Sequence, residues 1–130
     1  MATDEASRTT LFLKYAKLFL NESFVFEAKI CKELSIPFDA VKDHQVSALY
    51  QAKHGTFNHK IADGGYSPLP FDGFQMKMMP SYVIIFWYQH RNDKRFTMID
   101  IDMFCEEKRI SSRKSLLYER SCEIGRCLEL

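Results

Sequence analysis

The sequence has no long hydrophobic run. Nowhere does it approach the roughly eighteen consecutive uncharged apolar residues that a membrane-spanning helix needs. Residues 1–5 include two acids and no base, which is not how a secretory signal begins. We therefore expect a cytoplasmic protein without a membrane segment.

Neither sign of charge dominates. With 18 Lys and Arg residues against 17 Asp and Glu residues, the net charge is +1. This balance argues against a general electrostatic binder of nucleic acids, but it leaves room for a local basic groove. The stretch 108–120 is the most basic, and it is either a phosphate-contacting surface or a solvated helix start; its cations and hydroxyls are Arg109, Arg113, Lys114, Arg120, Ser111, Ser112 and Ser115.

The four cysteines, Cys31, Cys105, Cys122 and Cys127, lack the paired spacing of zinc ligands and have no close histidine partners. A zinc site is therefore not expected, and free thiols in a reducing compartment are the simpler interpretation. Glycine and proline are also few, with 5 and 4 copies, and the chain has no repeat or low-complexity segment. These features are typical of an ordinary globular protein.

What the chain does contain is enough apolar sequence for one sizeable core. Of its 130 residues 46% are hydrophobic, and 11 are phenylalanine. We expect a single domain over residues 1–130, with residues 1–8 frayed. Periodicity predicts helices at 9–21, 44–53 and 112–125, and strands at 24–30, 57–62, 71–78, 81–88 and 96–104. The first helix has an apolar stripe, which is Leu11, Phe12, Tyr15, Leu18 and Phe19. The run 81–88 is nearly all apolar, which is typical of a central strand buried on both faces with Trp87 in the core, and residues 31–39 are expected in a loop. The fold class expected from this order is α/β, with a mixed central β-sheet flanked by helices.

The segment Phe24–Ile30 carries the most informative pattern. It is aromatic and β-branched, so it reads as a strand whose side chains alternate between two faces. Glu27 and Lys29 then project from the same face, roughly 6–7 Å apart along the strand. A carboxylate that holds a divalent metal and an amine that faces an anionic substrate would explain this pair. An ordinary ion pair on a half-exposed strand is the alternative.

Metal-assisted phosphodiester hydrolysis needs a further oxygen ligand beside Glu27. Asp72 is the best second carboxylate, because it opens a strand after Pro70 and lies next to Gly73, which permits close approach. The backbone carbonyl of Ala28 is a third candidate ligand. Lys32, Lys42 and Lys53 flank this proposed site and would extend a basic groove.

Several residues together resemble the core of the PD-(D/E)XK nuclease superfamily. Phe26-Glu27-Ala28-Lys29 is followed by Ile36-Pro37-Phe38, Val41 and, fifteen residues after Lys29, by His44-Gln45. Within the superfamily the chain most resembles Holliday-junction resolvases of the RecU type and related phage proteins. The likeness covers residues 24–55 and, more loosely, the strands 81–88 and 96–104.

The resemblance implies a restriction-endonuclease-like core and an enzyme that hydrolyses DNA. Asp72 and Glu27, with the Ala28 carbonyl, would bind Mg²⁺ or Mn²⁺, and Lys29 would orient or activate water. Gln45 would place the water or contact the phosphate backbone; the alternative is a residue at a helix start that satisfies nearby backbone groups. The family's acidic motif normally precedes the E-x-K strand, but no aspartate lies between Glu5 and Glu27. We therefore interpret Asp72 as a relocated or circularly permuted motif. Branched or junction DNA and a second copy of the chain are the implied partners.

Other acidic and titratable residues have weaker functional readings. Asp63 lies in an Asp-Gly-Gly turn, Asp100 and Asp102 alternate on one strand face, and Glu119 and Glu123 lie on the last helix. His44 is either catalytic or a solvent-facing residue at a helix start. Two broader alternatives stay open: a non-catalytic nucleic-acid-binding or assembly protein on the same fold, and an interaction module in which Glu27 and Lys29 only pair.

Overall fold

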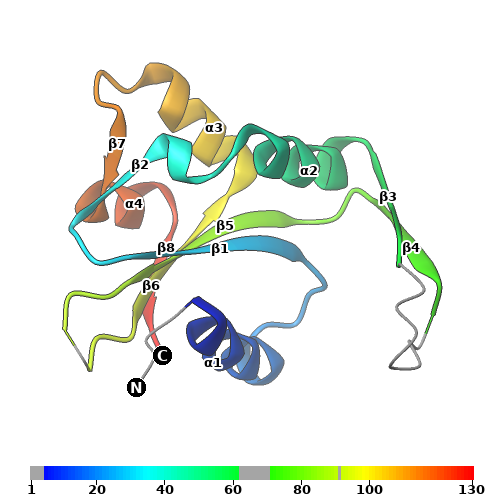
Figure 1. Ribbon diagram of the computed structural model, residues 1–130, viewed down its shortest axis with the longest axis horizontal. Coiled ribbons are helices and arrows are strands. Elements are labelled where there is room, and N and C mark those ends of the chain that lie inside the picture. Colours follow the sequence, from blue (N-terminus) through cyan, green and yellow to red (C-terminus); the bar gives the residue numbers. More distant parts are fainter. Residues whose placement is uncertain (1–4, 62–70, 91) are drawn as a thin grey trace.

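A four-stranded mixed sheet forms the centre of the molecule. The computed structural model describes residues 5–61, 71–90 and 92–130. The strands run in the order β1 (Val25–Cys31), β5 (Ser81–Trp87), β6 (Arg95–Asp100) and β8 (Arg126–Glu129). The first pair is parallel and the other two are antiparallel. Figure 1 shows one helix on one face and three on the other: α1 (Glu5–Phe19) against α2 (Asp43–His54), α3 (Ile101–Ile110) and α4 (Tyr118–Ile124).

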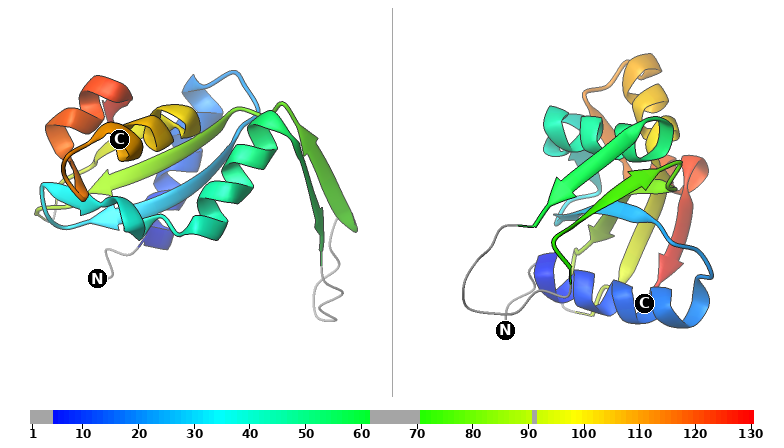
Figure 2. Two further views of the ribbon diagram at one scale, coloured as in Figure 1. Left: turned by 90° about the horizontal axis from the view of Figure 1, so that it is seen from above. Right: turned by 90° about the vertical axis from the view of Figure 1, so that its right-hand side faces the viewer.

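Two short antiparallel ribbons complete the fold. β2 (Ser35–Pro37) pairs with β7 (Ser115–Leu117), and the 3₁₀ turn η1 (Phe38–Ala40) follows β2. β3 (Thr56–Lys60) pairs with β4 (Gly73–Lys77) in a ribbon that we call the arm. The arm extends away from the central sheet (Figure 2), so only its near end is close to α2.

Alternation along β1 divides the hydrophobic core into two layers. Phe24, Phe26, Ala28 and Ile30 pack in the layer with α1, while Val25 and Cys31 belong to the layer with α2 and α3. The central strand β5 is buried on both faces, since every residue from Val83 to Trp87 is at most 1% exposed. Both predictions from the sequence, the two-faced first strand and the buried central strand, are confirmed.

Phe12 anchors α1 to the sheet. Its side chain is fully buried, and its ring lies 5.2–6.4 Å from four other rings in the edge-on arrangement that aromatic pairs favour; these belong to Phe24, Phe26, Phe86 and Phe96. The helix also begins earlier than predicted, at Glu5, so residues 5–8 are not frayed. The predicted apolar stripe is only partly buried, because Leu11, Leu18 and Phe19 are 37%, 75% and 67% exposed.

The prediction that the strand starting at residue 96 continues over residues 101–104 is wrong. β6 ends at Asp100, and α3 begins at Ile101, because the Asp100 carboxylate accepts a hydrogen bond from the Asp102 N–H and caps the helix. The predicted helix 112–125 is also shorter: Ser115–Leu117 pairs as a strand and α4 begins only at Tyr118. The segment 35–37, expected in a loop, is the strand β2.

The other predicted elements hold with small shifts of their ends. The helix predicted at 44–53 is α2, which Gly55 terminates, and the strands predicted at 57–62 and 71–78 are β3 and β4. Trp87 is core, as predicted, and its indole N–H donates to the Thr97 hydroxyl at 2.8 Å. No helix in residues 5–61, 71–90 or 92–130 has the length and apolar character to cross a membrane.

Asp93 holds the turn between β5 and β6. Its side chain is 1% exposed, and its carboxylate accepts from the Arg95 guanidinium at 2.7 and 2.8 Å and from the Gln89 and Arg95 backbone N–H groups at 3.2 Å. Hydrogen bonding to Arg95 lowers the pKa of Asp93 to about 2. A lowered carboxyl pKa means that the folded state favours the charged form.

We expect Asp93→Asn to lower the free energy of unfolding by about 2 kcal/mol at pH 7. The stabilisation is fully present above the ordinary carboxyl pKa near 3.8 and is lost as the pH falls toward 2. Urea unfolding of parent and variant at pH 7 and at about pH 2.5 measures the difference in free energy of unfolding. At the lower pH most of the stabilisation by Asp93 should be lost. If the free energies of unfolding of parent and variant differ by the same amount at both pH values, the charge of Asp93 contributes nothing to stability.

Candidate functional site

Glu27, Lys29 and Gln45 form a half-buried polar cluster between β1 and α2. The Lys29 ammonium lies 3.4 Å from Glu27 Oε1, and Gln45 Nε2 donates to the same oxygen at 2.8 Å. The Lys29 and Glu27 side chains are 19% and 29% exposed. The two residues project from one face of β1, as the alternation predicts, and α2 supplies the third residue. The predicted pair and Gln45 are therefore brought together.

The position of Gln45 follows from the first turn of α2. Its Oε1 accepts from the Lys42 N–H at 2.9 Å, so the side chain satisfies one of the free donors at the helix start. That bond leaves the amide nitrogen as the group facing Glu27. Gln45 therefore satisfies nearby backbone, which is one of its two interpretations from the sequence, and it also contacts Glu27, which the sequence did not predict. Its predicted role toward water or a phosphate backbone stays a prediction.

The backbone of β1 places the Ala28 carbonyl on the open edge of the sheet. The Val25 N–H donates to the Pro80 carbonyl at 2.9 Å, and the Cys31 carbonyl accepts from the Tyr88 N–H at 2.7 Å. The alternate residues Val25, Glu27, Lys29 and Cys31 thus turn their backbone groups toward β5. Ala28 turns its carbonyl the opposite way, to an edge where no strand of the described residues pairs with β1. This carbonyl is a second oxygen beside Glu27.

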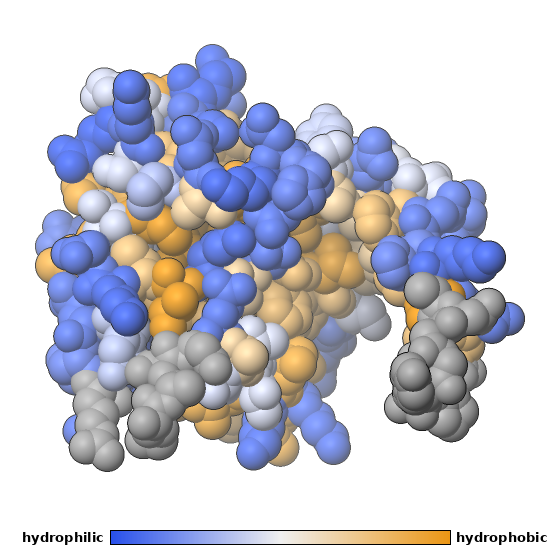
Figure 3. Space-filling model, in the orientation of Figure 1, coloured by the Kyte–Doolittle hydropathy of each residue, from blue (hydrophilic) through white to orange (hydrophobic). Residues whose placement is uncertain are grey.

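A groove runs from this cluster along α2 to the base of the arm. Its volume is about 220 Å³, and its walls are mostly apolar, with polar groups at one end; it is lined by Val25, Phe26, Glu27, His44, Gln45, Ala48, Leu49, Ala52, Phe57 and Met76. The space-filling view in Figure 3 shows the surface hollowed between the arm and the rest of the molecule. Glu27 therefore lies where an extended ligand has access to it.

Asp72 lies at the far end of the arm. Its side chain is exposed, and its carbonyl accepts from the Ile61 N–H at 2.7 Å, whereas the near end is fixed to α2 by a bond from the Met79 N–H to the Ala52 carbonyl. Met76 lines the groove with Glu27, but Asp72 is four residues further out, about 13 Å along an extended strand. The structure does not bring Asp72 into the Glu27 cluster, and the pairing of these carboxylates stays a prediction.

Asp100 and Asp102 do not share a strand face, because the strand has ended and α3 has begun. They pair instead with the last turn of α2: Lys53 Nζ lies 2.8 Å from Asp100 Oδ2, and His54 Nε2 lies 2.7 Å from Asp102 Oδ2. Hydrogen bonds to Lys53 and His54 outweigh burial and lower the pKa of Asp102. This ion-pair cluster joins α2 to α3, and it engages Lys53, which was expected in a basic groove.

The remaining candidates lie apart from the cluster or outside the described residues. His44 is exposed but lines the groove, Glu119 is exposed, and Glu123 pairs with Arg120 at 2.9 Å. Asp63 lies outside the described residues. Within the described parts of the chain, no three His, Cys, Asp or Glu side chains gather as metal ligands. A cation here would have to rely on Glu27, backbone oxygen and water, or on a carboxylate brought by the substrate-bound state.

Phe57 and Met76 are groove residues that the sequence reasoning missed. The arm has two unlike faces: Phe57 pairs with Met76 and His59 with Phe74 on one, while Thr56, Asn58, Lys60, Gln75 and Lys77 lie on the other. The alternation in Thr-Phe-Asn-His-Lys and Gly-Phe-Gln-Met-Lys was the available signal. Which face turns toward β1 was not readable, because it depends on how α2 leads into the arm.

Comparison with family models, with curated proteins and with solved structures finds no match for this chain. The class of protein that the structure defines is a mixed α/β domain with a four-stranded central sheet and four flanking helices in the described residues. The function of the site therefore has to be inferred from its own chemistry.

Proposed function

We propose that this protein is a Mg²⁺-dependent DNA endonuclease of the resolvase-like type that cuts branched DNA. The observation that carries the proposal is that Lys29 and Gln45 both contact Glu27 Oε1, and that Glu27 lines a groove. A carboxylate that lines a groove, with an ammonium 3.4 Å from it, supplies the charges that metal-assisted hydrolysis of a phosphodiester uses. A purely structural ion pair would not need the groove.

The oxygen atoms present suit Mg²⁺, which keeps several of its waters and takes only one or two protein carboxylates. Lys29 and Gln45 both contact Glu27 at Oε1, so Oε2 is the atom that we assign to a cation. The Ala28 carbonyl on the open edge is the neighbouring oxygen. Asp72 is the proposed second carboxylate, and it would reach the site only if the arm bends toward β1 when DNA binds.

Each residue then has a defined task. Gln45 fixes the orientation of the Glu27 carboxylate, and the Lys29 ammonium neutralises charge on the phosphate and orients the attacking water. When bound, the metal polarises the phosphoryl group and makes its water a better nucleophile. Water adds in line to phosphorus as the bond to the 3′ oxygen breaks, which leaves a 5′-phosphate.

The polar face of the arm supports DNA as the substrate. Thr56, Asn58, Lys60, Gln75 and Lys77 are all exposed on it. Two-stranded ribbons of this width enter a DNA groove, where lysine contacts phosphates and the amides of Asn and Gln contact base edges. Together with the groove beside Glu27, this face gives a duplex two contact regions on opposite sides of the arm.

A homodimer belongs to the same proposal, since two symmetric cuts resolve a four-way junction. Leu13, Leu18 and Phe19 are 49%, 75% and 67% exposed on α1 and would form the contact. We expect light scattering to give twice the monomer mass, and Leu18→Glu to return the monomer mass. A parent protein that is monomeric at every concentration would remove this part of the proposal.

A panel of DNA structures tests the activity directly. Labelled linear, nicked, flapped and four-way DNA are incubated with Mg²⁺, with Mn²⁺ or with EDTA, and the products are resolved on denaturing gels. We expect cleavage of branched DNA with either metal and none with EDTA.

The distance of Asp72 from the cluster favours one alternative, a non-catalytic DNA-binding protein on the same fold. That alternative gives binding to branched DNA with no cleavage under any metal. A protein with no affinity for DNA would instead leave Glu27 and Lys29 as a structural pair, and it would overturn both proposals.

A further inference from the structure

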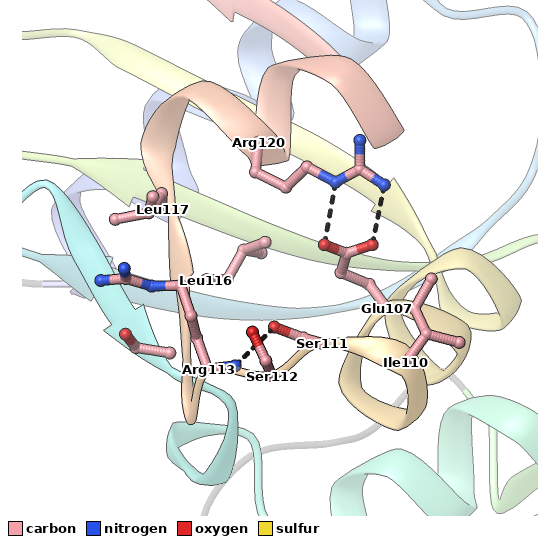
Figure 4. Close-up of a pocket in the computed structure, with 9 residues that line it drawn as sticks. Glu107, Ile110, Ser111, Ser112, Arg113, Leu116, Leu117 and Arg120 are labelled. Carbon is pink, nitrogen blue, oxygen red and sulfur yellow. Dashed lines mark hydrogen bonds and ion pairs between the residues drawn. The ribbon is translucent and has the colours of Figure 1, made fainter.

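A second pocket, of about 350 Å³, lies where α3 ends and β7 begins. Figure 4 shows the Arg120 guanidinium directed at the Glu107 carboxylate on one side, with Ser111 and Ser112 at the end of α3. Ser115 and Arg113 complete the polar part of the lining. Its apolar part is Ile110, Leu116 and Leu117. Two arginines and one glutamate give this lining an excess of positive charge.

The glutamate in the pocket is already neutralised. Glu107 is only 8% exposed, and its two carboxylate oxygens accept from Arg120 at 2.8 and 3.0 Å. Arg120 also pairs with Glu123, and Arg109 pairs with Glu106 outside the pocket. Two of the cations predicted in this basic stretch are therefore committed to carboxylates.

Arg113 is not committed in this way. Its side chain is exposed and extends away from the Glu107–Arg120 pair in Figure 4, and no acidic side chain within the described ranges forms an ion pair with it. Its backbone N–H donates to Ser111 Oγ at 3.1 Å, which fixes the turn. A hydroxyl that accepts one bond still has its proton to donate, so Ser111 remains a donor for a ligand.

The end of α3 itself offers an anion little. The carbonyl end of a helix carries partial negative charge, and the two cations of the last turn, Lys108 and Arg109, are paired with Asp39 and Glu106. An anion in the pocket therefore depends on the polar groups of the lining that are not committed to a carboxylate. The uncommitted polar groups in the lining are the Arg113 guanidinium and the hydroxyls of Ser111, Ser112 and Ser115. That set, a cation with several short-range donors, is the chemistry of a phosphate contact.

We infer that this pocket binds a backbone phosphate of DNA, through Arg113 and the three serine hydroxyls, at a distance from the cutting site. The inference rests on the proposed function for the identity of the polyanion. α2, α3 and the β2–β7 ribbon all lie on the sheet face that carries Glu27 and Lys29 (Figure 1), so one DNA molecule has access to both places. The pocket would then hold the flank of the substrate while the groove holds the scissile bond.

Fluorescence anisotropy of labelled branched DNA in EDTA, measured over a range of salt concentrations, tests this without any cleavage. We expect Arg113→Gln to weaken binding about fivefold and to lower the salt slope by about 1, because one phosphate contact is lost. Ser112→Ala should weaken binding by a smaller factor. The matched control is Arg109→Gln, which removes an equal charge four residues away from a side chain already paired with Glu106.

Three outcomes overturn the inference. In the first, Arg113→Gln binds DNA with the parent's affinity and salt slope. In the second, Arg113→Gln and Arg109→Gln lose the same amount of affinity, which would show a diffuse effect of charge. The third is a loss in Arg113→Gln that circular dichroism traces to unfolding, with Ser112→Ala folded and unchanged. Because binding is measured in EDTA, a protein that never cuts DNA would end the proposed function and still leave the phosphate contact supported.

Discussion

Glu27→Gln is expected to lower Mg²⁺-dependent cleavage of branched DNA by about a thousandfold, with folding and DNA binding retained. The substitution keeps the size of the side chain and removes the negative charge that a cation requires. The neutral amide also meets Gln45 and Lys29, which are both donors to the same position. Single-turnover cleavage rates, with binding measured separately in EDTA, give the two quantities.

Glu33→Gln is the matched control for this variant. Glu33 is an exposed glutamate two residues after β1, and its loss should leave the rate unchanged. Lys29→Ala should reduce the rate as Glu27→Gln does, since the ammonium acts on the same phosphate. A Glu27→Gln protein that cleaves at the parent's rate would show that the cluster is structural.

Asp72→Asn then decides how the second carboxylate acts. If cleavage falls as it does for Glu27→Gln, the arm must bring Asp72 to the site in the DNA-bound state, across the roughly 13 Å that four residues of strand span. If cleavage is unchanged, Asp72 is not a ligand, and Glu27 works with backbone oxygen and water. The cleavage rates of Asp72→Asn and Glu27→Gln are measured in the same assay, so they can be compared directly.

Phe12→Ala is expected to lower the free energy of unfolding by about 3–5 kcal/mol. The ring is 0% exposed and packs against Phe24, Phe26, Phe86 and Phe96, so its removal opens a cavity between α1 and the sheet. Urea unfolding followed by circular dichroism measures the change.

Phe19→Ala controls for the residue type on the same helix. Phe19 is 67% exposed, so the loss should stay within about 1 kcal/mol. Both variants are measured in the monomeric Leu18→Glu background, because Phe19 also belongs to the proposed dimer contact. Equal losses for the two variants would mean that α1 contributes through its helical content rather than through the buried ring. A loss confined to Phe12 would establish that α1 is held to the sheet mainly by this aromatic contact.

The local pattern around Glu27 was readable because it depends on one strand. Side chains alternate with a period of two, so the shared face of Glu27 and Lys29 follows once the strand is recognised. The apolar run 81–88 likewise indicates a strand covered on both faces, and β5 is that strand. The class of fold followed from the order of such segments.

The change from strand to helix at Asp100 was not readable from periodicity. Ile99-Asp100-Ile101-Asp102 alternates as a strand would, but the Asp100 side chain caps a helix that begins with the next residue. A cap of this kind competes with strand pairing, and β6 gains no partner residues beyond Asp100. Whether the residues after Asp100 form a strand or a helix depends on which side chains α3 buries, and this is decided by the tertiary structure.

By itself, the sequence determined which residues share a face of β1 and that Gln45 opens the following helix. Only the tertiary structure decided that Gln45 reaches Glu27, that Asp72 lies out along the arm, and that Arg113 pairs with no carboxylate of the described residues. The reason is physical: alternation and helix signals act over a few residues, whereas these placements depend on how α2, the arm and α3 pack against the sheet.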